Sequence, residues 1–151
     1  MEHRKPKVLF LSTGNATRSQ MAEGFLRALG DEHFDVMSAG VEPGPLNPLA
    51  NEVMKERGID ISAHESKNVT QSLKEHFAFV ITVCDAAKER SPIFPFTPRL
   101  LHWSIVDPAT ASGSAEQQIE VFRRVRDEIE DKIRRFVTET AQTSDNQLSI
   151  P

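Results

Sequence analysis

The stretch from residue 8 to residue 24 reads VLFLSTGNATRSQMAEG, and it decides the fold more than any other part of the chain. It opens with an apolar run that is typical of a buried strand, which we place at residues 7–11. Small and polar residues follow, as in a tight turn, and apolar residues then recur at helical spacing from Ser19 to Leu29. Gly30 suits the carboxyl end of this helix. The stretch therefore predicts a strand, a short loop and a helix in direct succession.

The same alternation of strands and helices continues beyond this stretch. Further strands are predicted at residues 34–38, 78–83 and 99–103, and further helices at residues 48–57, 69–75 and 115 to about 137. Strands and helices that alternate along a chain form a parallel sheet with helices on its faces. We therefore expect an α/β fold: a single-domain, four-stranded parallel sheet flanked by helices. The domain should span residues 1–137, and the polar, unpatterned residues 138–151 should form a flexible C-terminal tail.

The size and charge of the chain exclude several classes of protein. Its 151 residues are enough for one domain with a core, and its net charge of −4 argues against general binding of nucleic acid. The apolar runs are too short to span a membrane, and the first residues do not resemble a secretory signal. Cys84 is the single cysteine, so neither an intrachain disulfide nor a cysteine zinc site can form. We expect a cytoplasmic protein with no metal, cofactor, nucleic-acid or membrane partner.

The loop between the first strand and the first helix is the candidate binding site, because parallel α/β folds bind ligands beyond the carboxyl ends of their strands. Small residues allow successive backbone N–H groups to turn toward an anion, and the following helix adds its N-terminal amides. Arg18 offers a planar, charged fork for two oxygens, and Asn15 tolerates the left-handed backbone of a tight turn. The spacing alone also fits a routine strand–helix turn with a capping hydroxyl. The candidate oxyanion-binding residues are Ser12, Thr13, Gly14, Asn15, Ala16, Thr17, Arg18 and Ser19.

The quoted stretch closely resembles the opening of the thioredoxin-coupled arsenate reductases, a family that shares the fold of the low-molecular-weight protein tyrosine phosphatases. The loop of that family has the pattern Cys-x5-Arg. Further matching segments follow in the same order, so that the resemblance covers roughly residues 7–136: Ser38-Ala39-Gly40, Gly58-Ile59-Asp60-Ile61-Ser62, Val80-Ile81-Thr82-Val83-Cys84-Asp85, Leu101-His102-Trp103 and Asp107-Pro108. The resemblance implies a loop that binds phosphate or arsenate, and a thioredoxin-like reductant or a phosphotyrosine as partner.

The sequence departs from this family at its reactive cysteines. Ser12 stands where the family has its nucleophile, and a serine hydroxyl, unlike a thiol, needs an adjacent base to become nucleophilic. Cys84 matches the second cysteine of the redox relay, but Ser91 stands at the third position and Thr17 replaces a further family cysteine. We therefore expect no arsenate reduction by the three-cysteine relay. Ser12 is either natural or an engineered replacement, and Cys84 is either a relay residue or a small apolar residue of the core.

Two further sites take their roles from the resemblance. Asp107, followed by proline, matches the general acid of the family, although the same dipeptide also fits a simple turn. Some members hold a potassium ion beside the loop, and Asn15, Glu23 and Ser38 match three of its ligands. Lys67 stands at the fourth position, where its ammonium group could replace the ion, so we expect no potassium requirement. An exposed lysine on a loop is the alternative.

Three functions are open at this point. The first is an arsenate reductase-type protein that binds phosphate or arsenate in the Ser12–Arg18 loop with an incomplete redox relay. The second is hydrolysis of a phosphomonoester such as phosphotyrosine, which needs a nucleophile and a general acid but no relay. The third is a catalytically inactive module that binds an oxyanion or a phosphotyrosine. The catalytic candidates are Ser12, Arg18, Asp107 and Cys84.

Overall fold

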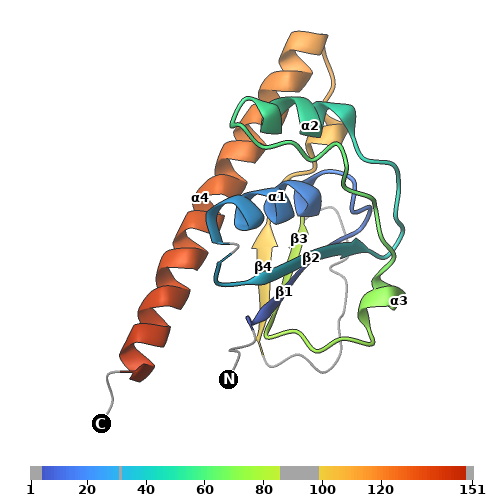
Figure 1. The fold of residues 1–151 in the computed structure, drawn as a ribbon. Helices are drawn as coiled ribbons and strands as arrows, with labels where there is room; N and C mark the ends of the chain where they lie inside the picture. The colour runs from blue at the N-terminus through green and yellow to red at the C-terminus, as the bar shows by residue number, and fades with distance from the viewer. Residues whose placement is uncertain (1–4, 31, 86–98, 149–151) are drawn as a thin grey trace.

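Four parallel strands form one sheet in the computed structural model, which describes residues 5–30, 32–85 and 99–148. The strand order is β2-β1-β3-β4, so β1 lies inside the sheet (Figure 1). The strands are β1 (Lys7–Ser12), β2 (Asp35–Gly40), β3 (Phe79–Cys84) and β4 (Leu100–Ser104). The prediction of a four-stranded parallel α/β sheet is confirmed, because every strand lies within one or two residues of its expected place.

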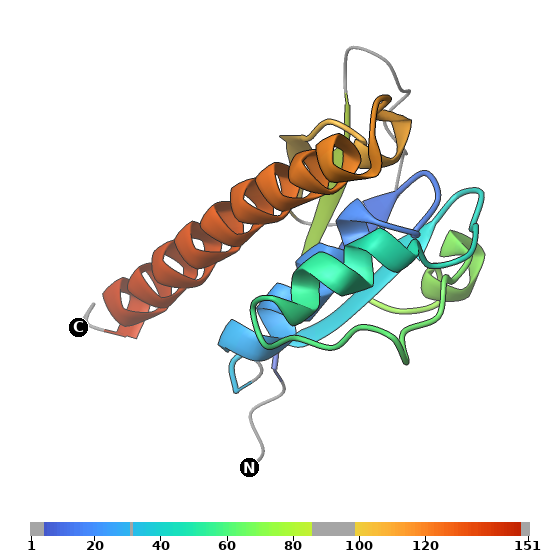
Figure 2. The same ribbon diagram turned by 90° about the horizontal axis from the view of Figure 1, so that it is seen from above.

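Helices cover both faces of this sheet. Side chains of β1 alternate between the faces: Val8 and Phe10 pack with α1 and α4 in the larger core, whereas Leu9 and Leu11 pack in a smaller cluster with Val69 of α3. Figure 2 shows α1 and α2 beside α4. β1 is therefore buried on both faces of the sheet, and its carboxyl end has a fixed position. The helices are α1 (Arg18–Gly30), α2 (Pro48–Lys55), α3 (Val69–Ser72) and α4 (Ala115–Leu148), with a 3-10 helix, η1 (Pro108–Thr110), before α4.

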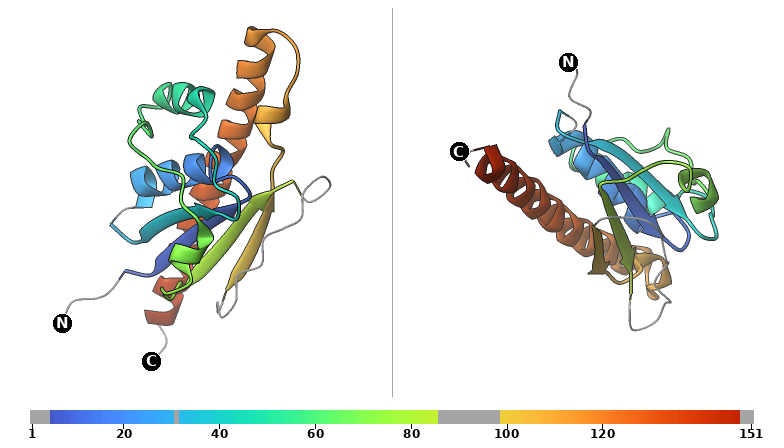
Figure 3. Two further views of the ribbon diagram at one scale, coloured as in Figure 1. Left: turned by 90° about the vertical axis from the view of Figure 1, so that its right-hand side faces the viewer. Right: turned by 90° about the horizontal axis from the view of Figure 1, so that it is seen from below.

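The last helix is longer than the sequence pattern predicts. We expected it to end near Val137, but α4 continues to Leu148 and extends past the sheet (Figure 3). No glycine or proline stands between residues 114 and 150 to stop it, and the hydroxyl of Thr138 donates to the carbonyl of Arg134 one turn earlier. The division at residue 137 into a domain and a flexible tail stays a prediction. Among the described residues, neither α4 nor any other helix combines the length and apolarity that crossing a membrane requires.

Candidate functional site

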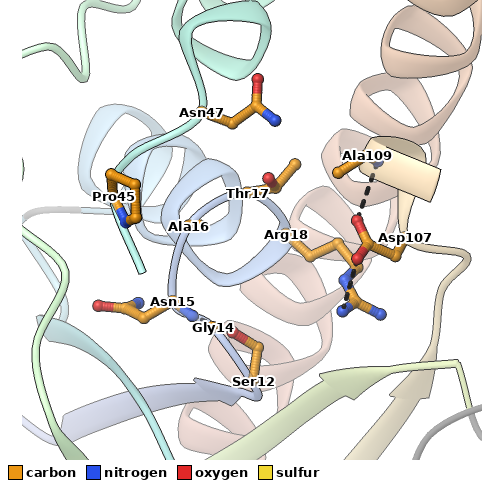
Figure 4. Close-up of a pocket in the computed structure, with 10 residues that line it drawn as sticks. All are labelled: Ser12, Gly14, Asn15, Ala16, Thr17, Arg18, Pro45, Asn47, Asp107 and Ala109. Carbon is orange, nitrogen blue, oxygen red and sulfur yellow. Dashed lines mark hydrogen bonds and ion pairs between the residues drawn. The ribbon is translucent and has the colours of Figure 1, made fainter. Parts of the chain in front are cut away.

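A small cavity lies at the carboxyl end of β1, where the chain turns into α1. Its volume is about 110 Å³, and the loop between these two elements forms one side of it. Its other sides come from the segment before α2 and from the region around η1 (Figure 4). Segments that are far apart in the sequence therefore meet around one point. The cavity is lined by Ser12, Gly14, Asn15, Ala16, Thr17, Arg18, Pro45, Asn47, Asp107 and Ala109.

The carbonyl groups of this loop accept hydrogen bonds from groups outside the loop. From residue 12 to residue 17, every carbonyl oxygen has such a partner. Backbone N–H groups of the segment 41–47 donate to the carbonyls of residues 12, 13, 14 and 16, at N···O distances of 2.8–3.3 Å. The carbonyl of Asn15 accepts from Ser66 Oγ at 2.9 Å, and that of Thr17 accepts from the N–H of Met21 at 2.9 Å. The segment 41–47 thus braces the loop, a role that the sequence did not reveal.

The direction of these carbonyls sets the direction of the N–H groups. A trans peptide group is planar, with its N–H on the side opposite its C=O. The N–H groups of residues 13–18 therefore turn away from the bracing partners and toward the inside of the loop. The N–H of Asn15 shows this direction, since it donates to Oγ of Ser12 at 3.0 Å. Successive inward N–H groups ahead of a helix form an anion-binding concavity.

Gly40, the last residue of β2, lets the loop lie close against the sheet. A β-carbon at this position would lie 2.7 Å from the carbonyl oxygen of Thr13 and 2.9 Å from the backbone nitrogen of Asn15. Both atoms belong to the backbone and cannot swing aside, so only glycine fits without a shift of the loop. The loop therefore depends on β2 as well as on its own residues.

Arg18, the first residue of α1, places its guanidinium at the cavity. Only 4% of the residue is exposed. Its Nη1 donates to the carbonyl of Ile105 at 3.0 Å, and its Nη2 lies 3.7 Å from Oδ2 of Asp107. Asp107 accepts through Oδ1 from the N–H of Ala109 at 3.0 Å and so caps η1 (Figure 4). The structure therefore brings Arg18 and Asp107, two predicted catalytic candidates, to the same side of the cavity.

The hydroxyl of Ser12 forms no hydrogen bond with an ionisable side chain among the described residues. Its Oγ lies 2.6 Å from Oγ of Ser19 and accepts from the N–H of Asn15. His64 and His102 form their hydrogen bonds with other side chains. Neither a hydroxyl nor an amide is a base that could take the proton of a serine. Ser12 thus sits well for contact with a ligand, but its described neighbours do not activate it as a nucleophile.

Asn15 connects the loop to a buried carboxylate. It has a φ of 49°, in the left-handed region that asparagine tolerates. Its Oδ1 accepts from the N–H of Lys67 at 2.8 Å, so its Nδ2 is the end that donates to the hydroxyls of Ser19 and Ser38, both at 2.9 Å. Ser38 in turn donates to Oε1 of Glu23 at 2.5 Å. Asn15, Ser38 and Glu23, all singled out in the sequence, therefore form one network beneath the loop.

The cation closest to Glu23 among the described residues is Arg27, whereas the sequence pointed to Lys67. Nε of Arg27 lies 2.9 Å from Oε2 of Glu23, but Nζ of Lys67 lies 3.9 Å from Oε1 and donates to the carbonyl of Glu65 at 2.7 Å. Lys67 reaches Asn15 through its backbone N–H and not through its ammonium group. Sequence reasoning missed Arg27, although a charge pair four residues apart in a helix was a usable signal.

His64 lies at the edge of the same network. Its Nδ1 is 3.1 Å from Oε1 of Gln20 and 3.7 Å from Oε2 of Glu23. Gln20 donates through Nε2 to Oδ1 of Asn15, so its Oε1 is an acceptor and Nδ1 of His64 carries a proton. Burial lowers the pKa of His64 below its usual value, and the carboxylate of Glu23 opposes this effect.

The remaining predicted and unpredicted residues complete the site. Cys84 is buried at the end of β3 and is not among the residues that line the described cavity, and Ser91 lies outside the described residues. Pro45, Asn47 and Ala109 line the cavity, although no ligand-binding pattern in the sequence pointed to them. For Asn47, the usable signal was its position before a proline that opens a helix.

Comparison with known proteins relates this fold and site to one family. The family described as "Low molecular weight phosphotyrosine protein phosphatase" matches residues 7–146. An arsenate reductase of Halalkalibacterium halodurans is 47% identical over 133 residues, which are 87% of this chain and 95% of that protein. An arsenate reductase of Bacillus subtilis is 43% identical over 130 residues, which are 85% of this chain and 93% of that protein. A solved structure titled "An arsenate reductase in the phosphate binding state" has a TM-score of 0.76 and 31% identity, and the match covers 89% of this chain and 98% of the other.

Proposed function

Since this chain belongs to the low-molecular-weight phosphotyrosine protein phosphatase family, and within it to the arsenate reductases that share this fold, we propose that it binds phosphate or arsenate in the Ser12–Arg18 loop. The observation that carries the proposal is the bracing of the loop. Because every carbonyl from residue 12 to residue 17 is held by a partner outside the loop, the N–H groups of residues 13–18 turn inward. A solved relative that is titled as phosphate-bound supports the same ligand.

Arg18 adds the charge that the backbone lacks. Its guanidinium is buried at the cavity, and a hydrogen bond between an ionised donor and an anion contributes about 1.5–3 kcal/mol, more than a neutral one. The N-terminal amides and dipole of α1 act on the same point. These groups need no chemistry at Ser12, so they support binding even where turnover is absent.

We propose that this sequence does not reduce arsenate by a three-cysteine relay. Such a relay passes a disulfide between successive thiols, and Cys84 is the single cysteine of the chain. A thioredoxin-like reductant would then act only on a mixed disulfide at Cys84. A chain without cysteine pairs also suits a reducing compartment, and we propose the cytoplasm.

A second candidate function is hydrolysis of a phosphomonoester, with phosphotyrosine as the family's type of substrate. The favouring observation is the carboxylate of Asp107, 3.7 Å from Arg18 and at the cavity, where a general acid for a leaving group belongs. Among the described residues Ser12 has no base as a neighbour, so we expect the chain as it stands to bind such an ester, and to hydrolyse it measurably only once Ser12 is replaced by cysteine.

Isothermal titration calorimetry of the purified chain with sodium phosphate and with sodium arsenate tests the proposed function. We expect saturable binding of one anion per chain, competition between the two anions, and loss of binding in Arg18→Ala. Parallel assays should detect no arsenate reduction. The absence of saturable binding of either anion to the native chain would remove the proposal.

We further propose that this binding does not require potassium. Glu23 already accepts from Arg27 at 2.9 Å and from Ser38 at 2.5 Å, so the protein itself supplies the cation beside the network. Titrations in sodium and in potassium buffers of equal ionic strength should give the same phosphate affinity. A clearly tighter affinity in potassium would contradict this proposal.

A further inference from the structure

We propose that the side-chain amide of Asn47 donates from its Nδ2 to the bound oxyanion and so determines how tightly the site holds it. This inference rests on the proposed function, because it concerns the same cavity. Asn47 directly precedes α2 and lines the cavity together with Arg18 and Asp107 (Figure 4). It comes from a segment that neither the loop nor α1 contains, so it approaches a ligand from a different side.

Two hydrogen bonds fix the position of Asn47, one through its backbone N–H and one through its side-chain oxygen. Its backbone N–H donates to the carbonyl of Ala16 at 3.0 Å, and its Oδ1 accepts from the N–H of Leu49 at 2.9 Å as the N-cap of α2. Because an N–H is an unambiguous donor, the oxygen of the amide must face Leu49 and the nitrogen must face the other way. Figure 4 shows the oxygen on the side of α2 and the nitrogen on the side of Thr17 and Ala109, which both line the cavity.

The nitrogen end is available for a ligand. Among the described residues, Nδ2 of Asn47 has no hydrogen-bond acceptor, whereas its Oδ1 and its backbone N–H are both paired. The Nδ2 group lines a small cavity, and the oxygen of the same amide is held in place as the helix cap. Such a donor is suited to bind an oxygen of the bound molecule. The loop amides and Arg18 hold the oxygens that face the loop, and Asn47 would hold one that faces α2.

Helix α2 keeps this donor in place. Arg126 of α4 donates to the carbonyl of Val53 at 3.1 Å and to Oε1 of Glu56 at 2.5 Å. Hydrogen bonds from Arg123 lower the pKa of Glu56 to about 2, so that this carboxylate keeps its charge, and its attachment to α4, well into the acid range. Because α2 is attached to α4 in this way, its N-cap residue is presented by a rigid element, as precise binding sites require.

Two substitutions separate the donor from the cap. Asn47→Asp keeps an oxygen for the N–H of Leu49, and aspartate caps helices as well as asparagine does. It replaces the donor with a negatively charged acceptor, so phosphate affinity should fall at least about thirtyfold while the melting temperature is unchanged or higher. Asn47→Ser keeps a capping hydroxyl but removes the longer-reaching amide donor Nδ2 without adding charge, so the affinity should fall about five- to tenfold. Calorimetric titration with inorganic phosphate and thermal melts measure both quantities.

Asn68→Asp is the matched control. Asn68 is also a helix N-cap, with Oδ1 accepting from the N–H of Thr70 at 2.9 Å, but it does not line the described cavity. The same substitution there adds the same charge to the protein and should leave phosphate affinity within twofold of the native value. If both Asn47 variants also stay within twofold while Arg18→Ala loses binding, the inference about Asn47 is wrong and the proposed function stands. If the native chain itself does not bind phosphate, the proposed function fails and the inference fails with it.

Discussion

The two ends of the loop between β1 and α1 differ in what they can do. At its carboxyl end, Arg18 is charged, buried and fixed by the carbonyl of Ile105. At its amino end, Ser12 is an uncharged hydroxyl whose described contacts are the hydroxyl of Ser19 and the N–H of Asn15. The first end can hold an anion as it stands, whereas the second needs a base that its described neighbours do not supply. Binding and bond cleavage on this fold therefore depend on separate residues, and a sequence can retain one without the other.

Replacing Ser12, at the amino end of the loop, should produce the largest change, which is in the rate of phosphate-ester hydrolysis. Ser12→Cys introduces a thiol at the end of β1 that faces the first turn of α1 and shares the cavity with Arg18, an environment that lowers a thiol pKa toward neutrality. We expect hydrolysis of p-nitrophenyl phosphate to rise at least about a thousandfold over the native chain, while phosphate affinity changes far less. A steady-state assay of p-nitrophenol release checks this. In the same background, Asp107→Asn should lower the rate about a hundredfold if Asp107 is the general acid. An inactive Ser12→Cys protein that still binds phosphate would favour the inactive binding module.

Replacing Arg18, at the carboxyl end of the loop, should abolish most of the phosphate binding. Arg18→Ala takes away a forked, charged donor worth about 1.5–3 kcal/mol for each of its two hydrogen bonds to the anion, so the phosphate affinity should fall at least about a hundredfold, to the point where saturable binding is lost. Arg18→Lys keeps the charge but loses the planar fork, so its phosphate affinity should lie between those of the native chain and Arg18→Ala. Calorimetric titration gives the affinities. Because Arg18 also donates to the carbonyl of Ile105, thermal melts should accompany the titrations; equal affinities for all three proteins would show that Arg18 does not hold the ligand.

The bracing of the loop can be tested with a pair of glycines. Gly40→Ala places a β-carbon 2.7 Å from the carbonyl oxygen of Thr13, whereas a β-carbon at Gly44 would meet nothing within 4 Å. We expect Gly40→Ala to lower the free energy of unfolding by about 1–3 kcal/mol, as overpacking does, and to weaken phosphate binding. Gly44→Ala should change neither quantity appreciably. Urea unfolding and calorimetry measure both effects, and a Gly40→Ala protein with native affinity would separate β2 from the binding site.

The smallest expected effect concerns His64. Burial lowers the pKa of His64 in the folded chain below its value of about 6.5 in the unfolded chain. At pH values between these two pKa values, the unfolded state therefore binds more protons than the folded state. The contribution of neutral His64 to stability is therefore complete above about pH 6.5 and is lost as the pH falls through the lowered pKa. His64→Gln should flatten this part of a plot of unfolding free energy against pH. Identical slopes for the native chain and His64→Gln would contradict the assignment.

The fold could be predicted because its information is local. The apolar run of β1, the helical spacing of α1 and the turn of small residues between them are each visible within a few residues, and so are Asn15, which tolerates a left-handed backbone, and the forked donor Arg18. The bracing by residues 41–47, the closeness of Gly40 and the amide of Asn47 could not be predicted. They arise only where β2 and the start of α2 pack against the loop, and no periodicity in the sequence records such a contact.

The neighbours of Glu23 illustrate the same limit. The sequence singled out Lys67 by its place in a family pattern, and its Nζ does lie 3.9 Å from Oε1 of Glu23, but a lysine on a long flexible stem reaches several acceptors, and here it donates to the carbonyl of Glu65. Arg27 lies one helical turn after Glu23, and this spacing places its Nε 2.9 Å from the Glu23 carboxylate. The length of α4 was underestimated for a related reason: polar residues without an apolar stripe can continue a helix when no glycine or proline interrupts them.

The most direct test of the account is a titration of the ¹⁵N-labelled chain with phosphate, followed through its backbone amide resonances. If the inward N–H groups of the braced loop hold the anion, the amides of residues 13–18 should shift most, saturate together with one anion per chain, and stop responding in Arg18→Ala. Saturable shifts confined to another part of the molecule, or no saturable shift at all, would contradict the claim that this loop binds an oxyanion.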